Sequence, residues 1–163
     1  MQVGAAVAVV LLSLDAQQLF LFAELLENSK RLPAGREAAA FLARDSQRGL
    51  YLFRWPASAT PRQSTYSGRI PAGTIAIAHT HPELSHLRMP SADDAALARH
   101  TGLDIYVITH AEIWVARGAT GNVVRLVSNG SWSARSHSRR LLIASSPGRS
   151  RTRDILRSRA ADE

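Results

Sequence analysis

The sequence contains no cysteine, and this absence excludes several kinds of chemistry. Without thiols the chain has no disulfides, no thiolate zinc site and no cysteine nucleophile. Any metal site in this protein must therefore be built from histidine, aspartate, glutamate and water. The lack of cysteine leaves the redox compartment undetermined.

Long apolar runs are also missing. The most apolar stretch covers residues 3 to 14, which is too short to span a bilayer, so we expect no membrane span. A secretory signal peptide would carry Lys or Arg before such a run, and none is present here. We expect a buried strand over residues 7 to 14 in a cytoplasmic protein. The alternative is export, with residues 1 to 16 acting as a signal peptide.

Length and charge indicate one domain with a tail. The chain has 163 residues, of which 45% are hydrophobic, enough for one core and too few for two. The net charge is +7, and most of it lies in residues 131 to 163, which hold eight arginines and three acidic residues. We therefore predict a domain over residues 1 to 130 and a flexible basic Ser/Arg-rich tail over residues 131 to 163.

The pattern of apolar residues predicts a mixture of helices and strands. Asp15 and Gln18 have the spacing of a helix N-cap, and apolar residues then recur at helical spacing as far as Ser29. Further elements are expected as a helix over residues 91 to 101 and strands over residues 50 to 55, 65 to 70, 74 to 78, 103 to 109, 111 to 116 and 122 to 127. The predicted fold class is α/β, a single domain with a mixed, curved sheet flanked by helices.

Two histidines follow the apolar strand at residues 74 to 78. Because side chains on a strand alternate between its faces, His79 and His81 point the same way. Catalytic zinc takes three protein ligands and keeps a water in the fourth position. Two imidazoles and a nearby carboxylate would suffice, and the candidate carboxylates are Glu83, Asp93 and Asp94. Taken alone, Ser91-x-x-Asp94 is simply a capping box for the helix that follows.

The order of these residues resembles a known motif. His79-x-His81-Pro82, followed by Ser91-x-x-Asp94 at the start of a helix, resembles the JAMM motif of the MPN metallopeptidase family. That motif also contains a glutamate on an early strand, and Glu37 begins the first apolar run after the first helix. The resemblance covers residues 7 to 127 and implies an MPN/JAB-like fold, which is similar to that of cytidine deaminases.

The resemblance implies a role for each residue of the motif. His79, His81 and Asp94 would bind one zinc ion, Glu37 would deprotonate water as the general base, and Ser91 would help to stabilise the oxyanion. The implied reaction is hydrolysis of a peptide or isopeptide bond in a peptide or protein, including ubiquitin-like or sulfur-carrier proteins. The spacing between His81 and Ser91 is longer than is usual in the family, so Asp93 is an alternative ligand if the loop register shifts.

Two other functions remain open at this stage. Some members of the same family are non-catalytic scaffolds, although they usually lack motif residues. The arginines of the tail could neutralise nucleic-acid phosphates, but no aromatic residues are interleaved with them for base stacking, so nucleic acid is the less favoured partner. The sequence predicts neither the oligomeric state nor the physiological substrate.

Overall fold

The computed structural model describes residues 14–33, 36–47, 49–57, 64–81, 88–128 and 132. The elements are α1 (Ala16–Ser29), β1 (Ala39–Asp45), β2 (Gly49–Arg54), β3 (Thr74–Thr80), α2 (Ala92–Thr101), β4 (Asp104–Ile108), β5 (Ile113–Ala116) and β6 (Val123–Val127). The strand predicted over residues 7 to 14 lies outside the described residues except for Leu14. The predicted tail lies outside them except for Trp132.

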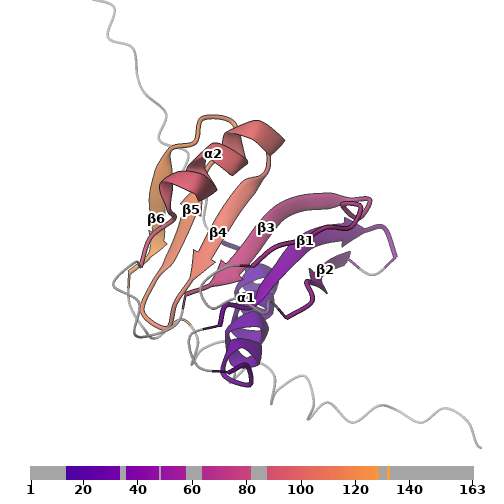
Figure 1. The fold of residues 1–163 in the computed structure, drawn as a ribbon. Helices are drawn as coiled ribbons and strands as arrows, with labels where there is room; N and C mark the ends of the chain where they lie inside the picture. The colour runs from indigo at the N-terminus through magenta and orange to yellow at the C-terminus, as the bar shows by residue number, and fades with distance from the viewer. Residues whose placement is uncertain are drawn as a thin grey trace, which may run out of the picture.

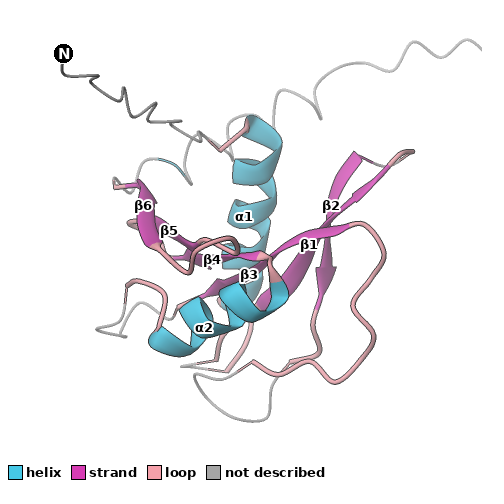
Figure 2. Cartoon of the chain, turned by 90° about the horizontal axis from the view of Figure 1, so that it is seen from above, coloured by secondary structure: helices cyan, strands magenta, loops and turns pink. Residues whose placement is uncertain are grey.

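The six strands form one mixed sheet. Their order is β2-β1-β3-β4-β5-β6, and β3 pairs with β4 in parallel while every other neighbouring pair is antiparallel (Figure 1). The two helices lie on opposite faces of this sheet (Figure 2). The predicted α/β class, with a mixed sheet flanked by helices, is confirmed. Neither described helix is long and apolar enough to cross a membrane.

Helix α1 covers the face of the sheet that carries the larger core. Its N-cap is the predicted one, because Asp15 Oδ1 accepts from the backbone N of Gln18 at 2.7 Å and Gln18 Oε1 accepts from the N of Asp15 at 3.1 Å. The core on this side joins the helix to alternate residues of β1 and β3, and it includes Phe22, Leu25, Leu42, Ala76 and Ala78. This packing holds β1 and β3 in place beneath the helix.

Helix α2 covers the opposite face with a smaller contact. Its N-cap is Ser91, and it ends at Gly102, whose φ of 71° is the left-handed conformation that glycine adopts at little cost. Ala98 is the one residue of α2 that is fully buried, and it packs with Phe41, Ile77 and Ile105. The predicted start and end of this helix are both confirmed.

One predicted strand is wrong. Residues 64 to 71 form no strand, although a short strand was expected over residues 65 to 70. Aromatic contacts hold this segment instead, because the Tyr66 ring packs 4.9 Å from that of Phe41 and 5.5 Å from that of Trp55, between ring centroids. The remaining strands predicted over residues 50 to 127 begin and end within two residues of the expected positions.

The pairing of β1 with β3 is held at its end by a buried hydroxyl. In this register Ala39 lies opposite His79 and Ala40 lies opposite Ala78. Beyond them, the backbone N of Thr80 donates to the carbonyl of Ala38 at 2.9 Å, and the Thr80 hydroxyl accepts from the N of Ala38 at 3.0 Å. Thr80 is 1% exposed, so no water replaces these bonds.

Replacing Thr80 with Val should destabilise the fold, because the buried N–H of Ala38 would lose its acceptor. We expect the free energy of unfolding to fall by about 1–3 kcal/mol, measured by urea denaturation. Thr65→Val at an exposed position is the matched control and should change it by less than about 0.5 kcal/mol. Equal stabilities in the two variants would show that the hydroxyl does not hold the strand end.

Candidate metal centre

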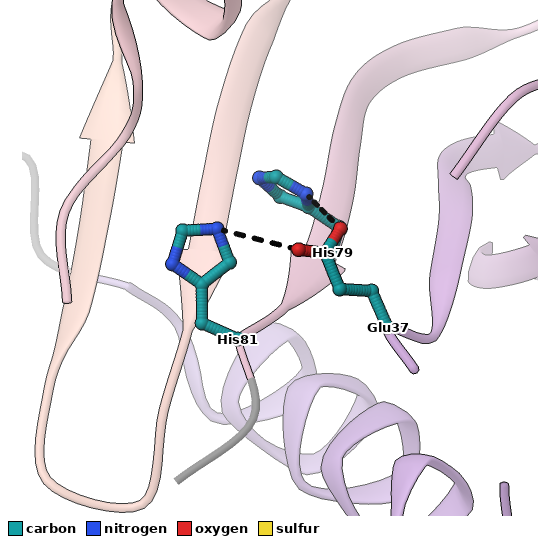
Figure 3. Close-up of side chains that lie close together, drawn as sticks. All are labelled: Glu37, His79 and His81. Carbon is teal, nitrogen blue, oxygen red and sulfur yellow. Dashed lines mark ion pairs between the residues drawn. The ribbon is translucent and has the colours of Figure 1, made fainter. Parts of the chain in front are cut away.

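The register of β1 and β3 brings a glutamate opposite the second histidine. Ala39 lies opposite His79, and continuing the antiparallel pairing by two residues places Glu37 opposite His81. Because side chains alternate along a strand, these four residues share the face that α2 covers. The small side chain of Ala39 leaves room for the carboxylate of Glu37 to reach diagonally to His79. Figure 3 shows the resulting cluster.

The three polar side chains of this cluster are in close contact. Glu37 Oε2 lies 3.4 Å from His79 Nδ1, and Glu37 Oε1 lies 3.9 Å from His81 Nε2 (Figure 3). The two imidazole rings are 5.0 Å apart between centroids. All three side chains are largely buried, at 8% to 13% exposure. One ligand atom from each lies within 4.8 Å of the others, which is close enough to hold a metal ion.

A second carboxylate reaches the other nitrogen of His79. Asp94 Oδ1 lies 3.5 Å from His79 Nε2. The other oxygen, Asp94 Oδ2, accepts hydrogen bonds from the backbone N and the hydroxyl of Ser91, both at 2.7 Å. The capping box of α2 therefore fixes the carboxylate of Asp94 through one oxygen and leaves the other facing the imidazole.

These carboxylates change the proton affinity of His79. Burial by itself works to lower the pKa of the ring, because the imidazolium loses its hydration. The hydrogen bond to Glu37 and the charges of Asp94 and Glu37 together exceed this effect, and the pKa of His79 is raised above 6.5. Two carboxylates around one imidazole therefore attract positive charge, which a proton or a metal cation can supply.

Two distances from His79 are close to the ligand spacing of tetrahedral zinc. Ligand atoms held about 2.0–2.1 Å from such an ion lie about 3.4 Å from each other. The distance from His79 Nε2 to Asp94 Oδ1 is 3.5 Å, and that from His79 Nδ1 to Glu37 Oε2 is 3.4 Å, so both are close to this spacing. In addition, His79 Nε2 is buried and has no hydrogen-bond partner among the described residues. A buried polar atom normally has a partner, and a metal ion would supply one here. A single ion uses one nitrogen of the ring, so it lies either toward Asp94 or toward Glu37.

The structure brings together most of the residues that the sequence singled out. Glu37, His79 and His81 converge at the end of β3 as one group whose ligand atoms lie within 4.8 Å of one another. Asp94 approaches this group only at His79, and Ser91 contacts Asp94. In contrast, Asp93 is exposed on the first turn of α2, and Glu83 lies outside the described residues.

Sequence reasoning missed two features of the site. One is Thr80, which lies between the two histidines and points to the opposite face, where its hydroxyl fixes the segment that leads from Glu37 into β1. A threonine directly after a run of apolar residues was the available signal. The other is a cavity that Glu37 lines together with Arg31 and Arg54, which come from separate segments of the chain. No local pattern connects those segments.

Comparison with known proteins adds no relative: no protein-family model, no curated protein and no solved structure matches this chain. The interpretation of the centre therefore depends on its own geometry and chemistry.

In the metal-free protein, we expect an NMR titration of the ring protons to give His79 a pKa above 6.5. Glu37→Gln should lower this pKa, because the variant lacks a carboxylate that stabilises the imidazolium. A raised folded-state pKa contributes stability that is fully present below the unfolded value of about 6.5 and is lost as the pH rises through the folded value. The unfolding free energy should thus decline over that interval more in the wild type than in Glu37→Gln.

Glu27→Gln serves as the control for this titration. It makes the same chemical change in an exposed ion pair with Lys30 on α1, away from the cluster. It should leave the titration of His79 as in the wild type. A pKa for His79 that is the same in wild type and Glu37→Gln would show that the carboxylate does not stabilise the charged ring.

Proposed function

We propose that this protein is a zinc-dependent hydrolase that cleaves a peptide or isopeptide bond with activated water, as its resemblance to JAMM/MPN metallopeptidases implies. One observation carries the proposal. At the end of β3, Glu37 lies beside both His79 and His81, and Asp94 lies beside His79 at the ring nitrogen that Glu37 does not contact. Such an arrangement provides both a ligand set and a separate base.

In this proposal zinc is held by His79, His81 and Asp94. Three features support the Asp94 side of His79 over the Glu37 side. The Nε2 atom on that side has no hydrogen-bond partner among the described residues, whereas the Nδ1 atom has Glu37. Asp94 is anchored by Ser91 through one oxygen, so its other oxygen is available. A ligating histidine commonly donates its second N–H to a carboxylate, and Glu37 would accept it.

This assignment keeps Glu37 out of the ligand set. Its Oε2 accepts from His79, and its Oε1 would act as the base. When bound, zinc lowers the pKa of a water molecule to about 7 and polarises a carbonyl. Glu37 is 9% exposed, and its two oxygens face the two histidines. It would take the proton of the attacking water and return it to the leaving nitrogen. Three protein ligands leave one position open, which is typical of catalytic rather than structural zinc.

Ser91 has a positioning role in this arrangement. Its hydroxyl donates to Asp94 Oδ2 and accepts from the backbone N of Asp94 at 3.1 Å. Direct donation to an oxyanion, which the resemblance implies, stays a prediction. The proposed substrates are peptides or proteins, including ubiquitin-like or sulfur-carrier proteins.

Two variants separate the roles of the carboxylates. Asp94→Asn should reduce zinc retained after dialysis at least about tenfold, because the ion loses an anionic ligand while the amide can still cap α2. Glu37→Gln should retain zinc but lose at least about 100-fold in peptide hydrolysis, because the base is gone. Zinc is measured by elemental analysis, and hydrolysis with a mixture of fluorogenic peptides.

Asp93→Asn is the matched control for both measurements. It removes a carboxylate from the adjacent, exposed position of the same helix and should change neither zinc content nor hydrolysis. The opposite pattern, with zinc lost in Glu37→Gln and kept in Asp94→Asn, would place the ion on the Glu37 side of His79. Glu37 would then be a ligand, and its role as the general base would be wrong.

A further inference from the structure

A cavity of about 230 Å³ adjoins the metal centre, and Glu37 belongs to both. Three segments line it: the C-terminal end of α1, the start of β1 and the end of β2. Leu25 and Leu32 contribute apolar surface from the α1 side. The volume is below the roughly 300 Å³ at the lower end of ligand pockets for drug-sized molecules, so the cavity suits a single residue rather than a long segment.

Two arginines give this cavity a positive charge. Arg31 follows α1 and Arg54 ends β2, and both line the cavity. Both are exposed, and neither guanidinium has an ion pair with a described residue. Guanidinium groups present a planar set of donors that matches a carboxylate. The cavity therefore combines apolar surface with two cations that have no ion pair with a described residue, while the carboxylate of Glu37 in its wall faces the two histidines.

A tryptophan belongs to the same wall. Trp55 lines the cavity, and its ring packs 5.1 Å from that of Phe41 and 5.5 Å from that of Tyr66, between centroids. Its indole Nε1 is buried away from the accessible surface, so the indole is a reporter of the wall and not a donor to a ligand. The donors within reach of a ligand are those of the two arginines, which favour an acceptor with negative charge.

We propose that this cavity binds a carboxylate group. If the proposed hydrolase function is correct, on which this part of the inference rests, the carboxylate belongs to the substrate and lies near the scissile bond, because Glu37 lines the cavity and also contacts both histidines. In the zinc-bound protein the two negative charges of Glu37 and Asp94 offset the two positive charges of the ion. The positive charge of the two arginines is then not offset, and an anionic substrate would neutralise it. The carboxylate is either the C-terminus of a peptide or the side chain of Asp or Glu.

The first experiment measures binding, without any hydrolysis, in the full-length protein both zinc-free and loaded with zinc. Three probes are titrated: N-acetylglutamate α-amide, with a side-chain carboxylate; N-acetylglutamine, with an α-carboxylate; and the neutral N-acetylglutamine amide. The readout is the NMR signal of the Trp55 indole N–H, assigned with Trp55→Phe. We expect a saturable shift with at least one carboxylate probe and none with the neutral probe. The probe that binds identifies the source of the carboxylate.

Matched double variants test the role of the arginines. Arg31→Gln with Arg54→Gln should weaken binding of the carboxylate probe at least tenfold. Arg44→Gln with Arg69→Gln makes the same change in charge at exposed positions away from the cavity and should leave the affinity within twofold. The inference is overturned if no carboxylate probe binds, if the neutral probe binds equally well, or if the two double variants have equal affinity.

The second experiment measures hydrolysis by the zinc-loaded protein, with peptides that carry the same three groups next to the cleaved bond. We expect kcat/KM to be at least tenfold higher for a carboxylate peptide, and this preference to disappear in Arg31→Gln with Arg54→Gln while the neutral peptide is still cleaved. Hydrolysis without a carboxylate preference overturns this inference and leaves the hydrolase proposal intact. Carboxylate binding without hydrolysis of any peptide overturns the hydrolase proposal and supports the cavity as a carboxylate site.

Discussion

The centre depends on one constraint, the antiparallel register between β1 and β3. This register places Ala39 opposite His79 and continues to Glu37 opposite His81. A slip by one residue would move every side chain of β1 to the other face and carry the carboxylate of Glu37 away from the imidazoles. The buried hydroxyl of Thr80 and the core beneath α1 oppose such a slip. The residues that keep the register therefore lie on the face opposite the one that carries the site.

One face of the sheet carries the larger core, and the other face carries the candidate site. On the α1 face, large apolar side chains pack into a continuous core that holds the strands. On the α2 face, the helix has one fully buried residue, Ala98, and its N-terminus lies at the end of β3. Helix α2 contributes to the site mainly through its first turn. There the capping box that begins the helix also orients Asp94 toward His79, so one local motif serves both folding and the candidate metal centre.

His79 is the residue that connects the two carboxylates of the site. Its ring lies between two carboxylates from different elements, Glu37 before β1 and Asp94 on α2. Because each carboxylate takes a different nitrogen, one can serve as a metal ligand while the other orients the ring and accepts protons. The adjoining cavity also involves Glu37, which lies between the histidines and two arginines that have no ion pair with a described residue.

The sequence by itself determined the features that depend on local periodicity. The period of a strand places His79 and His81 on one face, and Ser91 and Asp94 have the spacing that caps a helix. Only the tertiary structure decided which nitrogen of His79 each carboxylate faces, and that Arg31, Arg54 and Trp55 share one cavity with Glu37. It also replaced the strand expected near Tyr66 with aromatic packing. The reason is physical: strand period and helix caps involve residues close in sequence, whereas register, side-chain approach and cavities arise from segments that meet on folding.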